Sequence, residues 1–226
     1  MVLDAQEAQL RTLLKDICKT IGRNTDVPLH FRDLSYNNKY HITRQLANSN
    51  AAISIVAVDT HEVTSGRLRQ RGWAYRYYEK EMVRVATHFA ADAGESARVI
   101  FHRHEYLESF ADYIQNKLRN NSWYLRKRRS SQILYDRLSS LSMLDDECET
   151  LLGFADCVAH ACHLAMKPDT RWKQVNPSCL DLLTNCIWAG PTYERNPKLF
   201  GAILEPEGIC THMIPALPIA IRRHWE

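Results

Sequence analysis

One apolar, β-branched run constrains the fold more than any other part of this sequence. The run Ile53-Ser54-Ile55-Val56-Ala57-Val58 ends at Asp59, and its composition predicts a buried strand. Apolar residues recur at helical spacing on both sides of it, which predicts helices over 5–22, 36–48 and 67–91. A second short strand is predicted at 98–101. Because strands alternate with helices, the sequence indicates an α/β sheet flanked by helices.

The rest of the chain continues this alternation. Helices are predicted at 106–119 and 148–166, and segment 132–138 fits either a strand or a helix, with the flanking order favouring a strand. Gly22 is the expected end of the first helix. The long helix at 67–91 should carry one apolar stripe, made of Tyr75, Tyr78, Met82, Val85 and Phe89.

Length and composition fit one domain. The chain has 226 residues, of which 45% are hydrophobic and 24% charged, which is ample for a hydrophobic core. Gly and Pro become denser after Lys167. We therefore predict a single domain over 1–226, with a body at 1–167 and a loop-rich C-terminal extension at 168–226.

Charge and cysteine content bear on the partners and the cellular compartment expected for the protein. With 29 Lys and Arg against 26 Asp and Glu, the net charge of +3 permits a polyanionic partner without requiring one. No apolar run reaches the roughly 18 residues of a membrane span, and the N-terminus does not read as a secretion signal. The seven cysteines are irregularly spaced and contain no CxxC pair, so we expect reduced thiols and a cytoplasmic protein.

A first group of ionisable residues follows Pro28. His30, Arg32 and Asp33 lie within four residues, and an extended backbone would place His30 and Arg32 on one side and Asp33 on the other. These are candidate catalytic or metal-binding residues. The alternative is structural: Asp33 caps the next helix, with Ser35 as the rival cap.

A second group lies within the helix predicted at 148–166. Asp156, His160 and His163 are spaced i, i+4 and i+7, so they share one helix face. Their neighbours are apolar, so Asp156 is expected to be partly buried and to need a partner. Asp and His together suit Mn²⁺ or Zn²⁺, whereas Mg²⁺ would use mainly the carboxylate. The alternative is a hydrogen bond of Asp156 inside the core.

Two further groups bear on phosphate chemistry. His102, His104 and Glu105 follow a predicted strand, where open α/β sheets place ligands. The aromatic pair Trp123-Tyr124 precedes four cations, whose side chains suit nucleic-acid phosphates: Arg126, Lys127, Arg128 and Arg129. A solvated loop is the alternative for both groups. The common P-loop, dinucleotide, zincin and serine-hydrolase motifs do not occur.

These segments and their order resemble a bacterial family catalogued as domain of unknown function number 3800. The resemblance is carried by Leu29-His30-Phe31-Arg32-Asp33-Leu34-Ser35, strand 53–58, Val99-Ile100-Phe101 and Phe154-Ala155-Asp156-Cys157-Val158-Ala159, and it extends from about Leu10 onward. It implies a ribonuclease H-like fold and a metal-dependent nuclease, a hydrolase of nucleic-acid phosphodiesters.

The resemblance also implies a site. Asp33 and Asp156 would hold Mg²⁺ or Mn²⁺, with Glu105 as a possible third ligand and His30 or His160 orienting groups or transferring protons. The opening strand of the family, with its Asp-Glu motif, has no counterpart here. We therefore expect a partner strand from another chain or a second copy, an altered sheet, or a truncated chain. A catalytically degenerate binding or scaffold module is the alternative to a nuclease.

Overall fold

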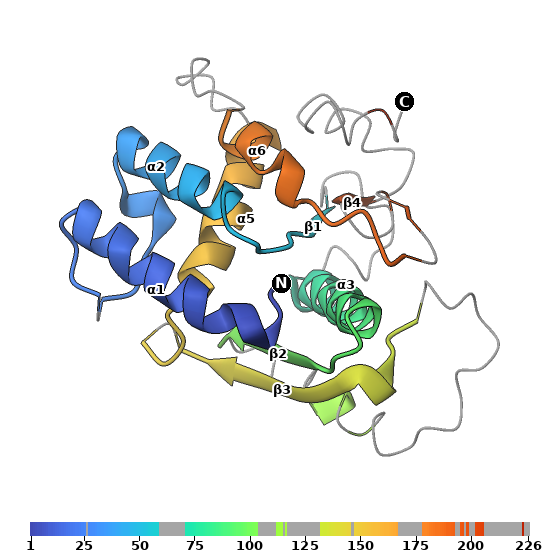
Figure 1. Ribbon diagram of the computed structural model, residues 1–226. Helices are drawn as coiled ribbons and strands as arrows, with labels where there is room; N and C mark the ends of the chain where they lie inside the picture. Colours follow the sequence, from blue (N-terminus) through green and yellow to red (C-terminus); the bar gives the residue numbers. More distant parts are fainter. Residues whose placement is uncertain are drawn as a thin grey trace. The chain divides into compact units, whose positions relative to one another are not determined.

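The chain folds as a mixed α/β protein, which confirms the class that its alternating patterns predict (Figure 1). The computed structural model describes residues 1–25, 27–58, 71–103, 112–114, 116, 132–145, 147–166, 178–192, 195–196, 198, 202–205 and 223. Within these residues, no helix is both long enough and apolar enough to cross a membrane.

The chain divides into two compact units. Unit 1 comprises Met1–Ile55, Asp146–Trp188 and Thr211–Glu226, and unit 2 comprises Val56–Asp145 and Ala189–Cys210. This division does not test the prediction of a single domain, which stays a prediction.

Unit 1 begins with two helices that match the predicted ones. Helix α1 (Asp4–Thr20) buries one face, and the chain leaves it through Gly22, whose φ of 70° is easily reached only without a Cβ. Helix α2 (Tyr36–Ala47) is capped by Ser35, whose Oγ accepts a hydrogen bond from the backbone N–H of Asn38 at 3.3 Å. The alternative in which Asp33 is the cap is therefore wrong.

The 3₁₀ helix η1 (Phe31–Asp33) precedes α2, and unit 1 continues with helix α5 (Leu152–Met166), helix α6 (Ser178–Leu182) and the 3₁₀ helix η5 (Thr184–Cys186). Helices α2, α5 and α6 pack against one another, and α5 also contacts η1. Helix α5 begins at Leu152 rather than at the predicted residue 148, and just before it the carboxylate of Glu149 accepts the N–H of Leu151 at 3.1 Å. The five largest enclosed side chains of unit 1 are Ile17, Phe31, Ile42, Leu180 and Leu183.

Unit 2 places helix α3 (Arg71–Asp92) against a parallel strand pair. Strand β2 (Ala97–His102) pairs with β3 (Leu138–Leu144), with Val99 opposite Leu141. Apolar residues from α3, both strands and their flanking segments form its core: Val83, Ala90, Ala97, Val99, Ile114, Ile133, Leu138 and Leu141. The strand predicted at 98–101 is confirmed.

Two expectations for unit 2 are partly wrong. Segment 132–138 is mostly the 3₁₀ helix η3 (Tyr135–Arg137) and its lead-in, and the strand starts only at Leu138. Of the apolar stripe predicted on α3, only Val85 is buried. The enclosed positions of α3 include four polar side chains: Glu79, Arg84, Thr87 and His88.

The predicted strand 53–58 is confirmed over its last four residues. Strand β1 (Ile55–Val58) pairs with β4 (Ala202–Glu205), while Ile53 forms an isolated parallel bridge with Ile187. Within the described residues the strands thus form two separate pairs. The helix predicted at 106–119 lies largely outside these residues, although Asp112, Tyr113, Ile114 and Asn116 are helical.

Candidate functional site

The two segments most specific to the family resemblance meet in unit 1, although they lie far apart in the sequence. The backbone N–H of Phe31 donates a hydrogen bond to Oδ2 of Asp156 at 2.8 Å, across 125 residues. The Phe31 side chain is fully buried, and its ring meets the ring of His160 edge-on, with 5.5 Å between centroids. Helix α5 and η1 therefore form one local site.

Helix α5 presents Asp156, His160 and His163 on one face, as their spacing predicts. The rings of His160 and His163 lie 6.3 Å apart between centroids. The expectation that Asp156 is partly buried is wrong, because its side chain is exposed. Its one hydrogen bond within the described part of the chain goes to the N–H of Phe31, so this carboxylate ties η1 to α5.

Lys39 of α2 is a member of the site that sequence reasoning missed. Its Nζ donates a hydrogen bond to the backbone carbonyl of Arg32 at 3.2 Å and lies 5.7 Å from the centroid of the Phe31 ring. The Arg32 side chain is 86% exposed. The available signal was the position of Lys39 one helical turn after the Ser35 cap, which directs it back toward η1.

The electrostatics of the site favour a neutral imidazole. Burial lowers the pKa of His160, and the cations Lys39 and Arg32 and the neighbouring His163 lower it further, while Asp156 acts in the opposite direction. At neutral pH His160 is therefore an uncharged group that can accept a proton or a hydrogen bond. The cations around it would favour an anionic ligand.

Two buried cysteines of α5 lie behind this site, and both are held as neutral thiols. The Oγ1 of Thr43 lies 3.6 Å from Sγ of Cys157, and both side chains are buried. Burial raises the pKa of Cys157 and of Cys162 to about 12, so both thiols stay protonated near neutral pH. These cysteines are core residues, not nucleophiles.

Asp33 and His30 lie beside the site but are not joined to its carboxylate. Asp33 is half exposed, and its Oδ1 lies 3.6 Å from Nε of Arg32. His30 is exposed, and its carbonyl accepts the backbone N–H of Asp33 at 3.2 Å as η1 begins. The structure thus brings Phe31, rather than Asp33, to Asp156.

The predicted metal site stays a prediction. Across the described ranges, no group of three or more His, Cys, Asp and Glu side chains is arranged to hold a metal ion. Glu105, the expected third ligand, lies outside the described residues, as do His104, the aromatic pair at 123–124 and the cations Arg126, Lys127, Arg128 and Arg129. His102 is exposed at the end of β2.

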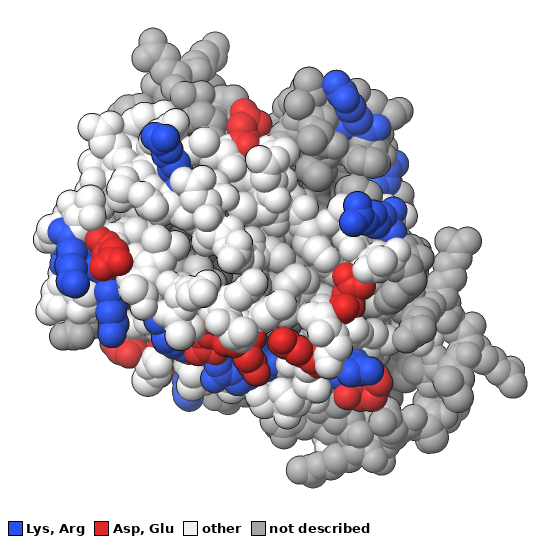
Figure 2. All heavy atoms as spheres, viewed as in Figure 1, with Lys and Arg blue, Asp and Glu red and all other residues white. Residues whose placement is uncertain are grey.

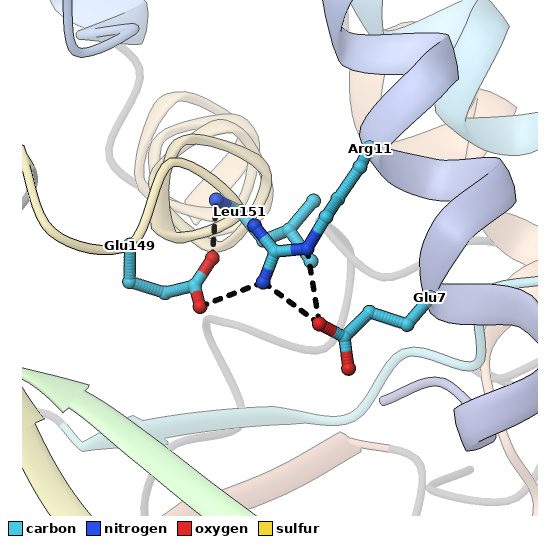
Figure 3. Close-up of polar contacts among 4 residues, drawn as sticks. All are labelled: Glu7, Arg11, Glu149 and Leu151. Atoms are coloured by element: carbon cyan, nitrogen blue, oxygen red, sulfur yellow. Dashed lines mark hydrogen bonds and ion pairs between the residues drawn. The ribbon is translucent and has the colours of Figure 1, made fainter.

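A second polar cluster in unit 1 is structural. Arg11 of α1 bridges two carboxylates, with its Nη2 at 2.8 Å from Oε1 of Glu7 and 2.9 Å from Oε2 of Glu149 (Figure 3). Glu149 is buried and also accepts the N–H of Leu151 at 3.1 Å. Because every group in the cluster already has a partner, it fixes the start of α5 against α1.

The chain matches no family model, and no curated protein and no solved structure is significantly similar to it.

Proposed function

We propose that this protein binds nucleic acid through the phosphate groups, using the η1–α2 surface of unit 1, which comprises Arg32, Tyr36 and Lys39. The observation that carries the proposal is that the Lys39 ammonium group lies beside the buried Phe31 ring and the backbone of Arg32, whose own cationic side chain is exposed. Lys39 is held there by the Arg32 carbonyl at 3.2 Å and by the Phe31 ring. A positioned cation loses less side-chain entropy when it binds an anion than a free one does.

The charge distribution of this region supports an anionic ligand. Helix α2 contains Lys39 and Arg44 and neither Asp nor Glu. Its N-terminal end directly follows η1, the segment that contains Arg32. The amides of a first helical turn add a positive potential. Helix α1 differs, since its charged side chains are of both signs along its length (Figure 2). Mixed charges of that kind do not select an anion.

Binding is favoured over cleavage because the nearby carboxylates have other contacts. Asp156 accepts the Phe31 N–H, and Asp33 lies against Arg32. Cleavage through two metal ions needs several carboxylates that hold cations about 4 Å apart. The described residues supply no group of three ligands, so a metal would need Glu105 or another residue beyond them.

A metal-dependent nuclease is the second candidate. Asp156 is exposed one helical turn before His160, whose lowered pKa keeps it neutral and able to take a proton. With this candidate we also propose a ribonuclease H-like fold, Mg²⁺ or Mn²⁺ as the cofactor, and a cytoplasmic location. A partner strand or a second copy, and phosphate contacts from residues 126–129, also remain proposals.

Binding is tested by fluorescence anisotropy with labelled DNA and RNA of about 12 nucleotides over a range of salt. We expect Arg32→Gln with Lys39→Gln to weaken binding about tenfold and to reduce the salt slope by about 2, roughly 1 per lost phosphate contact. The matched control replaces two cations of α1 with Lys15→Gln and Lys19→Gln. An equal loss in the control would contradict the assignment to the η1–α2 surface.

Cleavage is tested on the same oligonucleotides with Mg²⁺ or Mn²⁺ added. Asp156→Asn is a suitable variant, because the Asn side-chain oxygen can still accept the Phe31 N–H while the charge is lost. Metal-dependent product that disappears in Asp156→Asn would establish the second candidate. Equal product from both proteins would remove Asp156 from any catalytic role.

A further inference from the structure

We propose that the nucleic acid bound at the η1–α2 surface is single-stranded, with one base stacked on Tyr36. This inference rests on the proposed function and adds the class of nucleic acid that the site selects. It starts from an exposed aromatic side chain. Large hydrophobic side chains that are exposed in the described part of the chain are Val27, Tyr36 and Tyr113, and Tyr36 is 46% exposed.

Tyr36 lies between the two cations in the sequence and on the helix face of one of them. It is the first residue of α2, directly after the Ser35 cap, and Lys39 follows three residues later. Side chains three residues apart lie on the same helix face. Lys39 in turn reaches back to the carbonyl of Arg32, four residues before Tyr36. An exposed ring therefore lies on the same helix face as the cation Lys39, whose ammonium group reaches the backbone of the second cation, Arg32.

This combination matches an unpaired nucleotide. Its base offers an open π-face to an aromatic ring, while its phosphate offers negative charge to neighbouring cations. In a duplex the bases are already stacked on one another, so a tyrosine gains such a contact only by unstacking them. Two cations alone would bind either form. The added ring is what favours single strands.

The surface is also held in place before binding. The backbone of Phe31 is anchored by Asp156, and the capped first turn of α2 fixes the backbone of Tyr36. A base that stacks on Tyr36 thus meets a site whose backbone is already ordered. Stacking tolerates all four bases, so we expect little sequence preference.

The test compares a labelled 12-nucleotide oligothymidine with a labelled 12-base-pair duplex, using the full chain and fluorescence anisotropy. We expect the single strand to bind at least tenfold more tightly than the duplex. Tyr36→Leu should weaken single-strand binding about tenfold and duplex binding by less than about twofold, because it removes the ring but not the cations. Tyr36→Phe should bind as the wild type does, since it keeps the ring.

The matched control is Tyr113→Leu, because Tyr113 is 48% exposed and belongs to unit 2. It should leave both affinities unchanged. Circular dichroism melting of each variant excludes unfolding as a cause of lost binding. Equal affinity for both probes, or wild-type binding by Tyr36→Leu, would overturn the stacking proposal while phosphate binding stands. Failure of the wild type to bind either probe at low salt would overturn both proposals.

Discussion

Unit 1 and unit 2 each bury a glutamate, and the groups that surround the two carboxyl groups differ. Glu149 of unit 1 is 6% exposed and accepts hydrogen bonds from Arg11 and from the N–H of Leu151. Glu79 of unit 2 is 4% exposed, and burial raises its pKa to about 8, against the opposing effect of Arg76. Equal burial thus produces an ion pair in one unit and a carboxyl that holds its proton in the other.

The comparison shows what decides the charge state of a buried carboxyl. Burial penalises the ionised form in both units. In unit 1 a cation 2.9 Å away and a backbone N–H offset that penalty. In unit 2 the desolvation outweighs the effect of Arg76. We therefore expect Glu79 to make stability depend on pH, and the two sites to respond differently to substitution.

The largest expected effect is the pH dependence due to Glu79. Its folded-state pKa is raised, so the stability it contributes is complete below about pH 4.5 and is lost as the pH rises through about 8. Between pH 5 and 9 we expect a loss of roughly 4 kcal/mol in the free energy of unfolding, which Glu79→Gln should abolish. Urea denaturation at several pH values measures it.

The control for Glu79 is Glu147→Gln, since Glu147 is exposed. That variant should retain the decline in stability with pH. If Glu79→Gln also retained the full decline, the buried carboxyl of unit 2 would not be its source, and the contrast between the units would fail.

The next effect tests the ion pair of unit 1. Arg11→Met should cost about 2 kcal/mol, because the buried Glu149 loses its cation while Arg11 itself is partly exposed, which moderates the loss. Glu7→Gln removes the more exposed partner of Arg11 and should cost under about 0.5 kcal/mol. Denaturant titration at neutral pH measures both. A loss in Glu7→Gln as large as in Arg11→Met would show that the exposed pair carries the stability.

The elements of both units were largely predictable from sequence, because local spacing determines them. The periodicity of α1, the cap and spacing of α2 and the apolar composition of β2 each express interactions within a few residues. The shared face of Asp156, His160 and His163 follows from helix geometry in the same way. In the sequence Ser35 and Asp33 are rival caps because both residue types cap helices, and only the backbone path through η1 distinguishes them.

The remaining features depend on contacts between distant segments. Periodicity alone predicted an apolar face for α3, but the buried polar positions 79, 84, 87 and 88 depend on groups such as the Gln132 carbonyl, which lies 2.9 Å from Nε2 of His88 and accepts its hydrogen bond. The approach of Phe31 to Asp156 spans 125 residues and has no local signal. Lys39 differs, because it contacts Arg32 and Phe31 a few residues earlier in the chain, so its place in the site follows from the local geometry of the α2 start.

A smaller effect compares two buried threonines, one in each unit. Thr87 of unit 2 donates to the Arg84 carbonyl and accepts the backbone N–H of Leu134 at 3.2 Å. Thr43 of unit 1 donates to the Lys39 carbonyl and otherwise contacts the thiol of Cys157. We expect Thr87→Val to cost about 1.5 kcal/mol, because it leaves an N–H without its acceptor, and Thr43→Val about 0.5 kcal/mol.

Thermal denaturation of the two valine variants measures this difference. Valine has nearly the shape of threonine, so each variant serves as the packing control for the other. Equal losses would mean that the Leu134 N–H finds another acceptor, and that the polar core of unit 2 is no more specific than that of unit 1.

The smallest effect tests the start of α2 in unit 1. Ser35→Ala should lower the free energy of unfolding by about 1 kcal/mol, because the N–H of Asn38 loses its side-chain acceptor. Asp33→Ala should change it by less than about 0.5 kcal/mol, since the side chain of Asp33 is half exposed and pairs only with the neighbouring Arg32 among the described residues. Urea titration of both variants decides between the two rival caps. A larger loss for Asp33→Ala would mean that Asp33 caps α2. The backbone between η1 and α2 would then differ from the one described for the η1–α2 surface.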